Sequence, residues 1–184
     1  MRLTKNAKIL LYSAVIWAFG EGMLGPLFAL FTDKINGSIL DLTWAWATYL
    51  IVTGTLYIIV GKFIDKKRIK ERILLMGYAL NTIFTFGYLF VHSISHLFVI
   101  QIGLGIAAAL ATPAWDALYA KHGKEGHYGY QWGLIGGMNA IITGVAIVIG
   151  GMIITYFSFE VLFIIMGTVQ LVATLYQARI LIKN

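Results

Sequence analysis

Glu21 is the only charged residue in the apolar segment 9–31, and it lies near the middle of that segment. An ionised carboxylate at the centre of a membrane helix costs about 3 kcal/mol, and burial favours the protonated form of a carboxyl group. Glu21 is therefore a candidate for taking up and releasing a proton. Trp17 lies one helical turn earlier on the same face, where its ring is a candidate for stacking on a ligand.

The alternative for Glu21 is a structural role, in which the carboxyl group forms a hydrogen bond with a neighbouring helix. No Lys or Arg lies deep inside an apolar segment, so no basic side chain within the membrane is available to neutralise Glu21. We therefore expect Glu21 to be protonated or to bind a cationic ligand, rather than to form part of a site for an anion.

Amide side chains lie deep in four further apolar segments, at Asn81, Gln101, Asn139 and Gln170. Hydrogen bonds between membrane helices contribute only about 0.6 kcal/mol on average, so stability alone does not account for these residues. Each is a candidate for lining a cavity or for bridging two helices.

Other kinds of chemistry have little support. The chain has no cysteine, and its four histidines lie in expected loops. His92 and His96 have the i,i+4 spacing of a helical metal site, but a pair of polar residues at the membrane interface is the simpler interpretation. We expect no metal site and no cofactor. Without a phosphate-binding loop or a Ser-His-Asp arrangement, we do not expect an enzyme.

The elements that position these residues are six long apolar segments. The chain is 59% hydrophobic and 12% charged, with a mean hydropathy of +0.81. A membrane helix needs about 20 apolar residues, and continuous rather than alternating runs favour helices over strands. We expect an all-α polytopic membrane protein forming a single domain over 1–184, with segments at about 9–31, 42–60, 73–91, 97–115, 132–157 and 159–182.

Basic residues lie almost entirely in alternate connections. They precede the first segment, follow the second and fourth, and stand at the end of the sixth, whereas Lys34 alone lies on the opposite side. The positive-inside rule then places both termini in the cytoplasm, in a multi-pass protein of the plasma or inner membrane. The net charge of +6 belongs to these short loops, so we expect a lipid bilayer as partner and no nucleic acid.

Small residues recur at four-residue spacing in the fifth segment, as Gly133–Gly137 and Ala146–Gly150. Such pairs allow the backbones of two membrane helices to approach closely. We expect both pairs to pack inside the helix bundle.

The basic loop after the second segment carries a recognisable pattern. It runs Gly61-Lys-Phe-Ile-Asp65-Lys-Lys-Arg-Ile-Lys70 and resembles the signature loop of the major facilitator superfamily, G-x-x-x-D-[RK]-x-G-[RK]-[RK]. Gly61, Asp65, Lys66 and Lys70 match that pattern. Arg68 replaces the second glycine of the family, and Ile69 replaces a basic residue.

Three other stretches carry the same resemblance. Residues 103–121, GLGIAAALATPAWDALYAK, are similar to the fourth helix of the family, with Pro113 and then Asp116 before the loop. The glycine-rich stretch 133–151 is similar to its fifth helix. Residues 20–26, which contain Glu21, are similar to the end of its first helix.

The resemblance covers essentially the whole chain and implies one six-helix half of a twelve-helix transporter. In such transporters the halves are parallel repeats, with the substrate near the midplane between them. It implies secondary transport of a small molecule or ion by alternating access, possible proton coupling through Glu21, and pairing with a second copy or another half-size chain. Two alternatives stay open: a truncated, degenerate or engineered half, and a membrane scaffold or partner subunit that does not transport.

The resemblance also implies roles for individual residues. The first, fourth and fifth helices of the family line its central cavity, so the expected substrate or proton site consists of Glu21, Trp17, Gln101 and Asn139. Asn81 and Gln170, on the more peripheral third and sixth helices, are weaker candidates. A second group is expected to form a charge network that closes the cytoplasmic side: Gly61, Asp65, Lys66, Lys70 and Asp116.

Overall fold

The fold is an all-helical bundle, as the sequence predicts. The computed structural model describes residues 4–65, 69–123 and 126–182, and every regular element among them is a helix. Together these helices form six segments that are long and apolar enough to cross a membrane. In chain order the individual helices are α1 (Lys5–Gly22), η1 (Gly25–Leu27), α2 (Phe28–Lys34), α3 (Ile39–Asp65), α4 (Lys70–Gly87), η2 (Tyr88–Phe90), α5 (Ile94–Lys121), α6 (Tyr128–Tyr156) and α7 (Phe159–Ala178).

Several helices extend beyond the apolar runs that locate them. Helix α5 continues through Pro113 to Lys121, whereas the expected segment ends at 115. Helix α6 begins at Tyr128 rather than at 132. Hydropathy marks where the hydrocarbon layer ends, but the backbone hydrogen bonds of a helix continue into the polar region. Asp116 consequently lies inside α5 and not at its end.

The first membrane segment is broken just after Glu21. Helix α1 ends at Gly22, and the short helix η1 with Pro26 in its first turn leads into α2. Proline has no backbone N–H to donate to the preceding turn, so the Gly25–Pro26 pair accounts for the interruption. Glu21 therefore lies in the last turn of α1, next to an irregular stretch of backbone.

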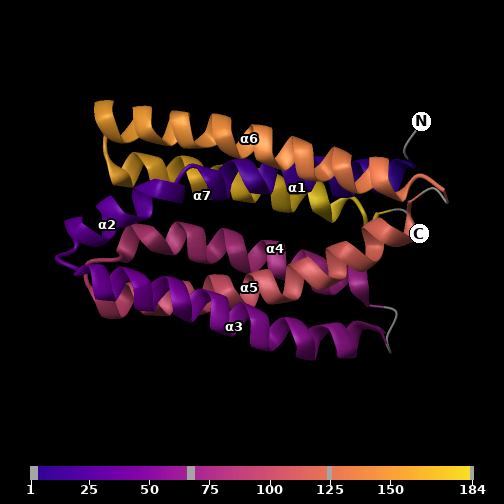
Figure 1. Cartoon of the computed structure of the whole chain (residues 1–184), viewed down its shortest axis with the longest axis horizontal. Coiled ribbons are helices and arrows are strands. Elements are labelled where there is room, and N and C mark those ends of the chain that lie inside the picture. Colours follow the sequence, from indigo (N-terminus) through magenta and orange to yellow (C-terminus); the bar gives the residue numbers. More distant parts are fainter. Residues whose placement is uncertain (1–3, 66–68, 124–125, 183–184) are drawn as a thin grey trace.

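The helices form two groups, which Figure 1 shows as an upper and a lower row. Helix α1 packs against α6 and α7 in one group, and α5 packs against α3 and α4 in the other. Contacts between α4 and α7 join the groups. The start of α1 and the end of α7 lie at the same end of the bundle.

Small residues allow the closest helix contacts. A Cβ atom built on Gly22 of α1 would lie 3.0 Å from the Cβ atom of Ala146, and one on Gly150 would collide with the Met23 carbonyl oxygen. The Ala146–Gly150 pair therefore packs inside the bundle, which confirms that prediction. For Gly133 and Gly137 the prediction is wrong, because a Cβ atom there would meet no described atom within 4 Å.

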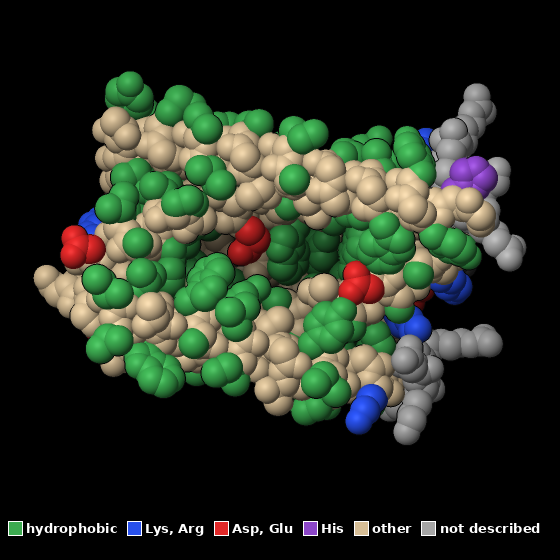
Figure 2. All heavy atoms as spheres, viewed as in Figure 1, with side chains coloured by type: hydrophobic (Ala, Val, Ile, Leu, Met, Phe, Trp, Pro, Cys, Tyr) green, Lys and Arg blue, Asp and Glu red, His purple; other side chains and the backbone are tan. Residues whose placement is uncertain are grey.

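Helices α3 and α6 bury the smallest share of their length. Figure 2 shows many hydrophobic side chains on the exposed surface of both rows, as expected for a surface in lipid. One exposed face of α6 carries only small residues, which we call the α6 stripe: Gly133, Gly137, Ala140 and Gly144. Their spacing of three or four residues places them on one side of the helix.

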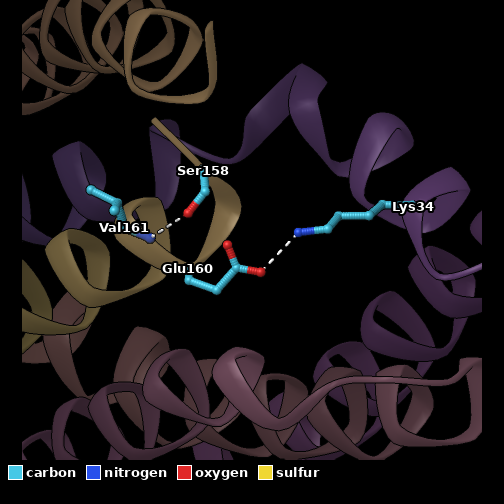
Figure 3. Close-up of polar contacts among 4 residues, drawn as sticks. All are labelled: Lys34, Ser158, Glu160 and Val161. Carbon is cyan, nitrogen blue, oxygen red and sulfur yellow. Dashed lines mark hydrogen bonds and ion pairs between the residues drawn. The ribbon is translucent and has the colours of Figure 1, made fainter. Parts of the chain in front are cut away.

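An ion pair joins α2 to α7 at the end of the bundle opposite the termini. The Lys34 Nζ atom, at the end of α2, lies 2.8 Å from Glu160 Oε1 in the first turn of α7 (Figure 3). The Ser158 hydroxyl caps α7 by accepting a hydrogen bond from the Val161 N–H at 3.4 Å. The two charged side chains are 47% and 60% exposed, so their ion pair contributes about 0–1 kcal/mol.

Candidate functional site

A cavity of about 550 Å³ lies between the two helix groups. Most of its walls come from α1, α3, α4, α5 and α6, and the short helices η1, α2 and η2 and Met166 of α7 complete them. In Figure 2 the surface is hollowed between the upper and lower rows, and acidic side chains are visible in that hollow. The volume is within the range of about 300–1,000 Å³ that is usual for small-molecule sites.

Glu21 lines this cavity and is held by two amide groups. Its Oε1 atom accepts hydrogen bonds from Asn81 Nδ2 at 2.9 Å and from Gln170 Nε2 at 3.1 Å. The same Gln170 nitrogen donates to the Trp17 carbonyl oxygen at 3.1 Å. Three helices, α1, α4 and α7, therefore meet at one carboxyl group.

Gly20 makes room for this arrangement. A Cβ atom at this position would lie 2.6 Å from Gln170 Nε2 and 3.0 Å from its Cδ atom. The absence of a side chain at Gly20 thus allows the Gln170 amide to reach both the α1 backbone and Glu21.

Aromatic rings form much of the wall beside Glu21. Trp17 meets Tyr78 edge to face, with ring centroids 4.3 Å apart. Tyr88 stacks on Phe163 at 5.0 Å, and its hydroxyl oxygen accepts a hydrogen bond from Gln101 Nε2 at 3.0 Å. Gln101, a predicted site residue, therefore lines the cavity and also fixes the position of a buried tyrosine.

A second carboxyl group lines the same cavity. Asp116 of α5 accepts a hydrogen bond from the Tyr57 hydroxyl of α3 at 2.6 Å. Both residues are only partly buried. The contact links α3 to α5 at the part of the cavity nearer the termini, towards which α5 runs.

The structure places the other predicted residues in different surroundings. Asn139 lines the cavity, and its buried Oδ1 atom has no hydrogen-bond partner among the described residues. Gly61 lies in the last turns of α3, and Lys70 begins α4. Lys66 lies outside the described residues, as does the side chain of Asp65, so the expected charge network with Asp116 stays a prediction.

Sequence reasoning underrated some residues and missed others. Asn81 and Gln170 ranked below Gln101 and Asn139, yet both bond directly to Glu21. Tyr57, Tyr78 and Tyr88 were not singled out. Their only signal is a hydroxyl group within an apolar segment, which also fits the aromatic residues that anchor helices at a membrane surface.

The family comparison agrees with this architecture. The model of the Major Facilitator Superfamily matches residues 10–183, nearly the whole chain. No curated protein sequence matches the chain.

Proposed function

Because the chain belongs to the major facilitator superfamily, a family of multi-pass membrane transporters, we propose that it is a half-size secondary transporter that works as a parallel pair of six-helix bundles. The pair consists of two copies of this chain, or of this chain and another half-size chain. A small solute binds between the bundles and crosses the membrane by alternating access. Proton uptake and release by Glu21 couples this movement to a proton gradient.

The observation that carries the proposal is the open cavity with a carboxyl group inside the membrane. Glu21 lies where an ionised group is costly, and amide groups from two other helices hold it in place. The hollow is open on the face shown in Figure 2, and α3 and α6 contribute to its walls. A second bundle against this face would separate the cavity from lipid.

The arrangement of the chain favours a partner in the same orientation. Helix α1 begins and α7 ends at one end of the bundle, so a second copy inserted the same way lies beside the first without inversion. The α6 stripe gives such a partner a surface for close helix contact, because small residues allow backbones to approach. By the positive-inside rule we propose that this end faces the cytoplasm, in the plasma or inner membrane.

Pairing predicts a cross-link along the α6 stripe. The chain contains no cysteine, so a single Gly144→Cys substitution introduces one thiol group on an exposed position of α6. In lipid nanodiscs, mild oxidation should convert most of this variant into a covalent dimer. Native mass spectrometry of the unmodified chain should show the same dimer mass.

Leu171→Cys is the matched control, because Leu171 is 42% exposed but lies on α7, away from the stripe. It should stay monomeric under oxidation. A single six-helix species in mass spectrometry, with no cross-link at Gly144, would exclude a pair of two copies of this chain. It would leave another half-size chain as the partner, or a scaffold role.

Alternating access predicts that a cavity residue reacts from both sides of the membrane. Ala18 lines the cavity one turn before Glu21. In oriented proteoliposomes, an Ala18→Cys variant should react with a membrane-impermeant maleimide from either side, whereas Leu171→Cys, which faces lipid, should react from neither. Labelling of Ala18→Cys from one side only would contradict alternating access.

A further inference from the structure

The described residues that line the cavity carry charge of one sign only. They include two carboxyl groups, Glu21 and Asp116, and no Lys, Arg or His. In a site of low dielectric constant, a charge is poorly screened. An anionic solute would therefore meet repulsion from these carboxylates and find no basic side chain among the described lining residues, whereas a cation would be attracted.

The hydrogen bonds around Glu21 offset part of the cost that burial imposes on its ionised form. Asn81 and Gln170 both donate N–H groups to Oε1, and donors of this kind stabilise a carboxylate rather than a protonated acid. Both donors bond to the Oε1 atom, which leaves the Oε2 side of the carboxylate for a ligand or a proton.

The walls suit a flat or apolar body attached to that cation. Aromatic rings from α1, α2, α3, α4, η2 and α5 line the cavity, namely those of Trp17, Phe28, Trp46, Tyr49, Tyr78, Tyr88 and Trp115. Aromatic faces attract cations through their quadrupole and also offer apolar surface for rings or alkyl groups. A small inorganic ion would use little of a cavity of about 550 Å³.

We propose that this cavity binds an organic cation with an aromatic or bulky apolar body, which pairs with Glu21 and packs against the aromatic wall. The proposal rests on the proposed function, since it names the class of solute that the transporter carries. Asp116 adds attraction for the same charge nearer the termini.

A pair of probes with the same shape and opposite charge tests the proposal. Binding of tetraphenylphosphonium and tetraphenylborate is measured on the full chain in lipid nanodiscs, with empty nanodiscs subtracted to remove binding by lipid. We expect the cation to bind at least about tenfold more tightly than the anion, a difference of about 1.4 kcal/mol. Glu21→Gln should remove most of that preference.

The matched control is Glu160→Gln, which makes the same carboxyl-to-amide exchange on α7 outside the cavity lining. It should bind both probes like the unmodified chain. Unfolding temperatures measured for both variants separate a lost site from a lost fold.

The two proposals fail in different ways. Absence of cation binding, equal binding of the anion, or full cation binding by Glu21→Gln would overturn the solute class. If Ala18→Cys is nevertheless labelled from both sides of the membrane, the chain is still a transporter, but for another class of solute. If that labelling also fails, the transporter itself is refuted.

Discussion

Replacing Glu21 by glutamine is expected to reduce proton-driven uptake of an organic cation to the level of protein-free liposomes, while the protein stays folded. Glutamine keeps an Oε1 acceptor in the same position, so the hydrogen bonds from Asn81 and Gln170 persist. The substitution removes the negative charge and the exchangeable proton. It also removes the cost of about 3 kcal/mol for an ionised carboxylate within the membrane, so we expect no loss of stability.

The measurement is uptake of radiolabelled methylphenylpyridinium into proteoliposomes with an acidic interior, alongside the unfolding temperature of the same preparation. Glu160→Gln serves as the control and should retain uptake, because the Glu160 side chain lies in the first turn of α7, outside the cavity lining. Normal uptake by Glu21→Gln would exclude this residue from the coupling mechanism. A loss of uptake that only follows a loss of folded protein would make Glu21 structural.

The second large effect is expected at Gly150, where α6 crosses the broken end of α1. A Cβ atom on Gly150 would collide with the Met23 carbonyl oxygen and would lie 2.9 Å from the carbonyl carbon. These are backbone atoms, which cannot rotate away as a flexible side chain can. Gly150→Ala should therefore force the two helices apart and cost about 1–3 kcal/mol, as overpacking usually does.

Thermal unfolding in mild detergent measures this effect, with Gly151→Ala as the control on the neighbouring residue. A Cβ atom on Gly151 meets no described atom within 4 Å, and alanine is a better helix former than glycine. Gly151→Ala should thus be neutral or slightly stabilising. Equal unfolding temperatures for the two variants would show that α1 and α6 do not pack as closely as described.

Much of the fold follows from the sequence alone, because lipid requires long apolar helices and each leaves a continuous run of apolar residues. The close contact at Ala146 and Gly150 was also predictable from their spacing. The pair Gly133–Gly137 has the same spacing but faces outward. Spacing shows that a helix can be approached closely, but it does not show which side of the helix faces the bundle.

The site was predictable in part. Glu21 can be identified from the sequence because it is a lone charge in an apolar run. Its partners Asn81 and Gln170 cannot be assigned to it in this way, because they lie 60 and 149 residues further along the chain. Only the packing of α4 and α7 beside α1 brings them to it. Asp116 was expected at a helix end, because hydropathy does not reveal that α5 continues to Lys121.

The packing of α1 against α6 and α7 has a consequence for biosynthesis. Helix α1 leaves the ribosome before α6 and α7, so it must wait for both before it acquires these neighbours. During that interval Glu21 enters the bilayer without Gln170, and even Asn81 arrives only with α4. The insertion machinery or an assisting protein has to shelter this carboxyl group meanwhile, and a chain whose synthesis stops after α5 would leave α1 exposed to quality-control proteases.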